Sequence, residues 1–146
     1  MRYSIILMSF VFFALLTACG YRMKEVARET VISVSGQRFK VPSRYGIEAT
    51  ALDLCIRLPD LYRHNKDIKN PGYLDEKGEV IYVLAYGIYS GGKEKYLGSG
   101  KYYIDHLEQC FTVGMDDRDA GFDYIDVRPS APINVKQVVW YSHLYL

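Results

Sequence analysis

Few residues in this 146-residue chain could carry chemistry, and their spacing matches no familiar catalytic or metal site. The acidic run Asp116, Asp117, Asp119 and Asp123 suggests calcium, because carboxylate oxygens are the ligands that calcium prefers. An EF-hand loop that starts at Asp117 would place Arg128 at its twelfth position, where a bidentate glutamate is required. We therefore interpret the run as a solvated acidic loop.

The glycine-flanked serines do not form an esterase motif. Ser90 precedes Gly91, and Ser99 lies between Gly98 and Gly100, whereas a nucleophile elbow requires G-x-S-x-G at a strand-to-helix turn. The three histidines are scattered and share no metal-ligand spacing with the cysteines. The sequence predicts a protein that is not an enzyme and that needs neither a metal nor another cofactor.

Charge is balanced over the chain, with 18 Lys+Arg, 17 Asp+Glu and a formal net charge of +1. Nucleic-acid binding requires a surplus of basic charge on one face, so the composition argues against a nucleic-acid partner. The hydrophobic fraction of 49% is that of a folded chain, but it is unevenly distributed, since residues 3–18 contain no charge.

The N-terminus has the three parts of an export signal. A positive start at Arg2 precedes an apolar run over residues 5–16, and small residues follow it. The run is shorter than the roughly 20 residues that span a membrane. Leu16-Thr17-Ala18-Cys19 resembles a bacterial lipobox, which implies cleavage before Cys19 and acylation of its thiol and its new amino group. The alternatives are a plain signal peptide with an accidental cysteine, or an N-terminal anchor helix.

Processing changes the composition of the chain. Removal of residues 1–18 from 146 leaves 128 residues with 17 basic and 17 acidic side chains, because Arg2 is lost, and a chain of this length buries one core. More than one acyl chain makes anchoring stable. Gly20 and not Asp follows Cys19, and this resembles the pattern of Gram-negative lipoproteins that are sorted to the outer membrane. We expect a periplasm-facing protein with a polar, lipidated tether over residues 19–29 and a single β-rich domain over residues 30–146.

Two cysteines remain once Cys19 carries lipid. Export places the domain in an oxidising compartment, and both Cys55 and Cys110 lie in strand-like runs. We expect a disulfide between them, which would close a long loop and stabilise the fold by about 4 kcal/mol in the chain-entropy model. The alternative is a pair of buried free thiols.

The mature chain has the patterns of a mainly β fold, either an antiparallel β-sandwich or a strongly curved sheet with at most one or two short helices. Residues 50–58 alternate with a period of two, and Pro59 ends that strand. A hairpin is expected around Ser35-Gly36-Gln37, between residues 30–35 and 38–42. Residues 79–90 are apolar on both faces, which indicates a central strand. Further strands are expected over residues 95–97, 101–113, 122–128 and 135–146.

Two polar stretches are expected to be loops, residues 60–78 and residues 114–121. The first contains Pro71-Gly72, which is a turn signal. A loop as long as this in a compact domain is usually functional or flexible.

Tyrosine is the unusual residue of this chain, with 14 copies, of which 13 remain after processing. A tyrosine buries a large ring and keeps a polar end in water, so it suits half-exposed sheets and protein interfaces. Tyrosine is also a good strand former, and the clusters Tyr82/Tyr86/Tyr89 and Tyr102/Tyr103 fit both explanations. In the absence of a catalytic motif, this composition favours a binding protein.

One stretch narrows the class of binding protein. Gln37-Arg38-Phe39-Lys40-Val41-Pro42-Ser43-Arg44-Tyr45 contains F-x-V-P-x-x-Y and precedes the strand that carries Cys55. Together with the lipobox, the cysteine pair and the size, this stretch resembles the type VI secretion lipase-immunity lipoproteins. The resemblance implies a periplasmic protein that binds a phospholipase effector from a rival cell and blocks its access to membrane lipid.

The mechanism implied by this resemblance is steric, and the two polar loops are the predicted contact regions. Asp116, Asp117 and Asp119 would meet a basic rim on the effector and speed the encounter, and Tyr102 and Tyr103 complete the predicted contact set. Two other functions stay open. One is a structural or assembly lipoprotein of the bacterial envelope. The other is a small lipid- or ligand-binding lipoprotein, which would require an apolar cavity inside the sheet.

Overall fold

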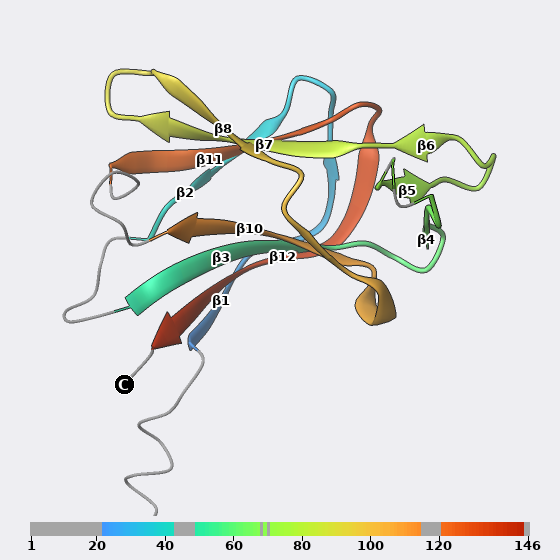
Figure 1. The fold of residues 1–146 in the computed structure, drawn as a ribbon, viewed down its shortest axis with the longest axis horizontal. Coiled ribbons are helices and arrows are strands. Elements are labelled where there is room, and N and C mark those ends of the chain that lie inside the picture. The colour runs from blue at the N-terminus through green and yellow to red at the C-terminus, as the bar shows by residue number, and fades with distance from the viewer. Residues whose placement is uncertain (1–21, 43–48, 68, 70, 115–120, 145–146) are drawn as a thin grey trace, which may run out of the picture.

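The computed structural model describes residues 22–42, 49–67, 69, 71–114 and 121–144, which form twelve strands and one short 3-10 helix. Two antiparallel sheets, A and B, pack face to face, and a small third sheet, C, lies at one end of the pair (Figure 1). The prediction of a mainly β, sandwich-like fold is confirmed.

Sheet A contains the two longest strands of the described chain. Its strand order is β1 (Arg22–Ile32), β12 (Ile133–Leu144), β3 (Ala49–Arg57), β10 (Glu108–Gly114) and β9 (Lys101–Tyr103). β12 lies between β1 and β3, so strands from the two ends of the chain lie side by side. The alternation predicted for residues 50–58 is present in β3, where Leu54 and Ile56 face the core and Cys55 faces outward.

Sheet B faces sheet A across the core. Its strand order is β2 (Gln37–Lys40), β11 (Phe122–Pro129), β7 (Val83–Tyr89) and β8 (Glu94–Gly98). A register shift between Phe122 and Tyr124 turns Phe122 toward the core beside Ile125 and Val127. The Phe122 ring fills the space over Gly87, where an added Cβ would overlap it.

The core lies between the inner faces of the two sheets. Trp140 and Phe111 of sheet A pack with Ile125 and Val83 of sheet B, and all four are almost fully buried. Gln109 also points inward, and its Nε2 donates a hydrogen bond to the Val83 carbonyl oxygen at 3.0 Å, which ties the sheets together through a buried polar contact.

Residues 22–29 lie in β1, so the predicted tether is wrong over this stretch. The polar sequence is compatible with a strand because β1 is an edge strand, paired only with β12, and its free edge and outer face meet water. Ala27 supplies the apolar contact with the core, next to a register shift between Glu25 and Ala27. Cys19 to Tyr21 lie outside the described residues.

The predicted hairpin at residues 30–42 is wrong as a pairing, although its turn is present. The Gly36 amide donates to the Ser33 carbonyl oxygen at 2.9 Å. β1 then pairs with β12 and β2 pairs with β11, so the turn carries the chain from sheet A to sheet B. Gly36 has a φ of +86°, and a side chain there would also collide with Asp126.

The apolar run over residues 79–90 is divided between two sheets rather than forming one strand. β6 (Val80–Ile81) belongs to sheet C and β7 to sheet B, and Tyr82 separates them. The Tyr82 amide donates to Ser130 Oγ at 2.9 Å, and the Ser130 amide donates to the Tyr82 carbonyl oxygen at 2.8 Å. These two bonds hold the chain at the point where it changes sheet.

The stretch 60–78, predicted to be an irregular loop, contributes two strands to sheet C. β4 (Arg63–His64) and β5 (Tyr73–Leu74) pair in series with β6. Asp75 Oδ1 accepts hydrogen bonds from the Lys77 and Glu79 amides at 2.9 and 2.8 Å, which fixes the turn into β6.

The expected strand over residues 101–113 is interrupted once. The 3-10 helix η1 (Ile104–His106) lies between β9 and β10, and Leu107 ends it with a φ of +47°. The expected strands near residues 95–97, 122–128 and 135–146 are confirmed as β8, β11 and β12, although residues 145–146 lie outside the described residues.

Candidate functional site

The predicted contact residues have different environments. Asp116, Asp117 and Asp119, like the predicted lipidation residue Cys19, lie outside the described residues. Tyr103 is 44% exposed at the edge of sheet A, whereas Tyr102 is half-buried. The two tyrosines are neighbours in sequence, but they point to opposite faces of β9 because strand side chains alternate.

Tyr102 packs sheet C against sheet A. Its ring lies 5.6 Å from that of Tyr73 and 6.2 Å from that of His64, and its hydroxyl donates to the Pro71 carbonyl oxygen at 3.4 Å. Burial raises the pKa of Tyr102, and it raises the pKa of Tyr73 further. Both phenols are therefore neutral at physiological pH, which fits a packing role for this cluster.

The predicted disulfide is confirmed. Cys55 and Cys110 are direct cross-strand partners on β3 and β10, with Cα atoms 4.0 Å apart. Glu108 lies beside Cys110 and forms an ion pair with Arg57 at 2.8 Å. Glu108 and the two sulfurs are close enough to share an ion, but the disulfide leaves no thiolate ligand there.

The outer face of sheet B carries the most distinctive surface of the described chain. We call it the tyrosine face and define it by residues at the outward positions of the four strands and just before β7. Cross-strand pairing aligns them in rows, of which one runs Arg38–Asp126–Tyr86–Tyr96 across the whole sheet. The members are Arg38, Lys40, Tyr82, Leu84, Tyr86, Ile88, Glu94, Tyr96, Tyr124, Asp126 and Arg128.

Arg128 is held at the centre of the tyrosine face by three neighbours. Its Nη1 donates to Glu94 Oε2 at 3.1 Å, and its Nη2 donates to Asp126 Oδ2 at 2.9 Å. Its guanidinium carbon lies 4.3 Å above the centroid of the Tyr86 ring, which is a cation–π contact. The carboxylates of Glu94 and Asp126 raise the pKa of Arg128 above its usual value, and Arg128 in turn lowers the pKa of Glu94.

Asp126 is the buried carboxylate to which Arg128 is bonded. Its side chain is only 6% exposed, and its Oδ2 also lies 3.6 Å from Nε of Arg38. A buried carboxylate requires paired cations, and Asp126 has two: Arg128, which is hydrogen-bonded to it, and the more exposed Arg38 nearby. Its other oxygen lies against Gly36, which links the tyrosine face to the turn between the sheets.

The aromatic rings of this face remain accessible to solvent. Tyr96 is 58% exposed, and Tyr82 and Tyr124 are each 38% exposed. The centroid of the Tyr96 ring lies 5.4 Å from that of Tyr86 on the neighbouring strand, so the two rings pack against each other. A fixed, half-exposed set of tyrosine and arginine side chains is typical of residues that dominate protein–protein binding.

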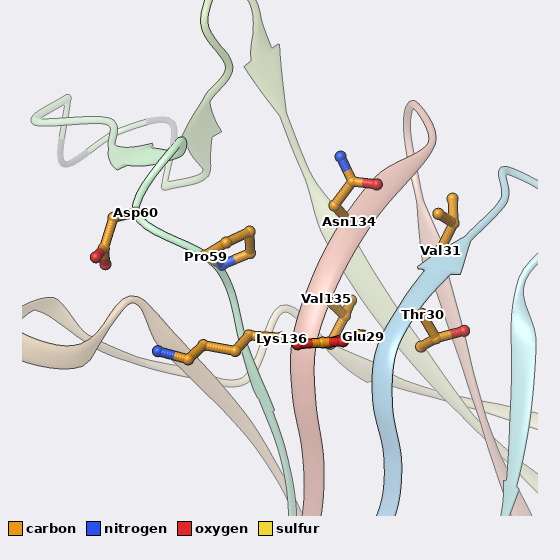
Figure 2. Close-up of a pocket in the computed structure, with 8 residues that line it drawn as sticks. All are labelled: Glu29, Thr30, Val31, Pro59, Asp60, Asn134, Val135 and Lys136. Atoms are coloured by element: carbon orange, nitrogen blue, oxygen red, sulfur yellow. The ribbon is translucent and has the colours of Figure 1, made fainter.

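A separate cavity of about 400 Å³ lies between β1, β12 and the Pro59–Asp60 segment (Figure 2). Glu29, which has a φ of +46°, lies on β1 between the residues that pair with Gln137 and Val135 of β12, and Lys136 of β12 extends toward the Pro59–Asp60 segment. Most of its lining residues are exposed and three of them are charged (Glu29, Asp60 and Lys136), so this cavity is an open surface hollow and not the enclosed apolar chamber that a lipid carrier requires. Its lining residues are Glu29, Thr30, Val31, Pro59, Asp60, Asn134, Val135 and Lys136.

Comparison with known proteins assigns no family, since no family model, curated protein or solved structure matches the chain. Within the part of the chain that the structure describes, no helix is long and apolar enough to cross a membrane.

The sequence reasoning missed the charged residues of the tyrosine face. In the strand expected over residues 122–128, the alternation of side chains puts Tyr124, Asp126 and Arg128 on one side. Their meaning depended on which strands lie beside β11, because Arg38 and Glu94 come from β2 and β8. Those pairings are not visible in local sequence.

Proposed function

We propose that this chain is a lipid-anchored protein of the bacterial cell envelope that binds a type VI secreted phospholipase through the tyrosine face and neutralises it sterically. The observation that carries the proposal is the central arrangement of Arg128, which is stacked on Tyr86 and bonded to Glu94 and Asp126 beneath accessible tyrosine rings. A preorganised surface of this kind loses little side-chain entropy when a partner binds.

The proposed location rests on two features of the chain. The sequence up to Cys19 resembles a lipoprotein signal. The Cys55–Cys110 disulfide is compatible with an oxidising, non-cytoplasmic compartment. A periplasm-facing protein on the outer membrane would meet an incoming phospholipase close to the lipid that this enzyme attacks.

Steric neutralisation needs only a rigid surface large enough to cover the entrance of the effector's active site. Sheet B supplies this rigidity, because its outward ion pairs join β2, β11 and β8 through Asp126, Arg128 and Glu94. The acidic residues Asp116, Asp117 and Asp119 would add electrostatic steering at the rim. Reversal of all three charges should weaken effector binding at low salt, and an unchanged affinity would exclude that loop from the interface.

The direct test is deletion of the gene in a strain that faces an armed sibling. The deletion strain should be killed, and the wild-type gene supplied in trans should restore survival. Full survival of the deletion strain would refute the immunity function and would favour a structural envelope lipoprotein. Replacement of Cys19 by Ser should release the protein from the membrane fraction, and its retention there would refute lipidation at this residue.

A further inference from the structure

The first strand of the fold begins very close to the proposed lipid attachment. β1 starts at Arg22, three residues after Cys19. A chain of three residues spans at most about 11 Å when fully extended. The headgroup layer of one leaflet is roughly 5–8 Å thick, given a hydrocarbon core of about 30 Å in a bilayer of about 40–45 Å. The link is therefore too short to hold the domain away from the membrane.

We propose that the end of the sandwich formed by the start of β1 and the end of β12 rests on the lipid headgroups of the bilayer. This inference rests on the lipidation of Cys19 in the proposed function. The two strand ends lie side by side, since Arg22 pairs with Ser142 and Met23 pairs with Tyr141 (Figure 1).

The side chains at this end suit a headgroup layer. Met23 is 59% exposed and offers an apolar contact, and Tyr141 beside it is a partly exposed ring with a polar tip. Lys24 is exposed and can pair with anionic lipid. Apolar, tyrosine and lysine side chains are the groups that favour the interface between lipid and water.

The rest of β1 is less suited to lipid. Glu25 and Glu29 follow along the same strand, and the Glu25 carboxylate is partly exposed and paired with Arg28 at 2.9 Å. Carboxylates are repelled by the negative surface of an anionic membrane. Contact is therefore expected at the amino end of β1 and not along its whole length.

The strand provides a matched pair of probe positions. Met23 and Val34 are almost equally exposed, at 59% and 56%. Met23 is the second residue of β1, and Val34 lies two residues beyond its other end. From Met23 to the end of β1 at Ile32 is nine residue steps, which span at most roughly 30 Å, and Val34 lies in the turn that follows. The single native tryptophan, Trp140, is 2% exposed and supplies a constant background.

The test uses the full, lipidated chain in vesicles of phosphatidylethanolamine and phosphatidylglycerol that carry a headgroup-level spin-label quencher. In the Met23→Trp variant, the quencher should remove at least half of the fluorescence that the introduced tryptophan adds to that of Trp140. In the Val34→Trp variant, the quencher should remove no more fluorescence than it does from the parent protein. Equal quenching at the two positions, or none at Met23→Trp, would overturn the inference.

Fractionation of the wild-type protein separates this inference from the proposed anchoring. An unquenched Met23→Trp in protein that stays with the membrane would refute the headgroup contact alone. A wild-type protein that is absent from the membrane fraction would refute both the anchor and the contact.

Discussion

The outer faces of sheets A and B both carry an ion pair between an arginine and a glutamate and an exposed tyrosine, but they differ in which side chains reach solvent. On sheet A, Val139, Cys55 and Cys110 form a cross-strand row that is almost fully buried. On sheet B, the corresponding row ends in Tyr96, which is more than half exposed. The middle of the sheet A row is therefore covered around the disulfide, although Glu25 and Lys101 at its two ends are exposed. The outer face of sheet B keeps aromatic rings accessible around the buried carboxylate of Asp126.

Two arginines show the same contrast. Arg57 on sheet A forms an ion pair with Glu108, and Arg128 on sheet B forms ion pairs with Glu94 and Asp126. Their side chains are similarly exposed, at 37% and 30%, but only Arg128 stacks on a tyrosine. Similar charge pairs thus join β3 to β10 on sheet A, whereas on sheet B they hold Arg128 over the Tyr86 ring, on the face proposed to bind the partner.

Removal of the disulfide should have the largest effect. Cys55→Ala with Cys110→Ala should lower the free energy of unfolding by about 4 kcal/mol, because the cross-link closes a loop of 55 residues in the unfolded chain. Urea unfolding of the variant and of the wild type under oxidising conditions measures this loss. The affinity of the folded fraction for the phospholipase should not change, since the disulfide lies on the other sheet. A large loss of affinity would place the interface on sheet A.

Substitution of the central arginine should have the next largest effect. Arg128→Gln keeps a donor for Asp126 but loses the charge and the stacking on Tyr86, so binding should weaken by about 2 kcal/mol, which is roughly 30-fold in Kd. Arg57→Gln is the matched control on sheet A and should bind as the wild type does. Titration calorimetry with the phospholipase compares the two, and equal losses would remove the distinction between the faces.

A single tyrosine should contribute less. Tyr96→Ala removes an exposed ring from the tyrosine face and should weaken binding by about 1 kcal/mol, or roughly fivefold in Kd. Tyr103→Ala removes a ring of comparable exposure from the edge of sheet A. If the Tyr103 variant loses affinity and the Tyr96 variant does not, the earlier prediction that Tyr103 contacts the partner is favoured over the tyrosine face.

The smallest effect concerns acid stability. Hydrogen bonds from Arg28 and Gln137 lower the pKa of Glu25 to about 2 from an ordinary value of 4.5. Because the pKa is lower in the folded chain, the stabilisation is complete above pH 4.5 and is lost as the pH falls toward 2. Glu25→Gln should flatten this part of the stability curve only slightly, since solvent screens an exposed pair. Thermal unfolding between pH 2 and pH 5 measures the change, and an unaltered slope would show that the pair adds nothing to sheet A.

The sequence predicted those parts of the fold whose signal is local. The alternation over residues 50–58 predicted β3, and two cysteines in strand-like runs of a chain with an export-like N-terminus predicted the disulfide. The failures at residues 22–42 share one cause, which is pairing with distant strands. A polar stretch becomes the edge strand β1 only because β12 lies beside it, more than 100 residues later in the chain.

The same limit applies to the candidate site. Tyrosine abundance indicated a binding surface, but a count cannot tell the packing role of Tyr102 from the exposure of Tyr96. The ion pairs that hold Arg128 join β8 and β11, which are far apart in sequence. A spacing rule within one strand does not reveal such a contact.

Protection of a deletion strain by variants of the chain tests the central claim most directly. The variant Tyr96→Ala with Arg128→Gln would be expressed beside Tyr103→Ala with Arg57→Gln, at equal levels in the membrane fraction, and each strain would face an armed sibling. If the tyrosine face binds the phospholipase, the first strain should die and the second should survive. Survival of both strains, or death of only the second, would contradict it.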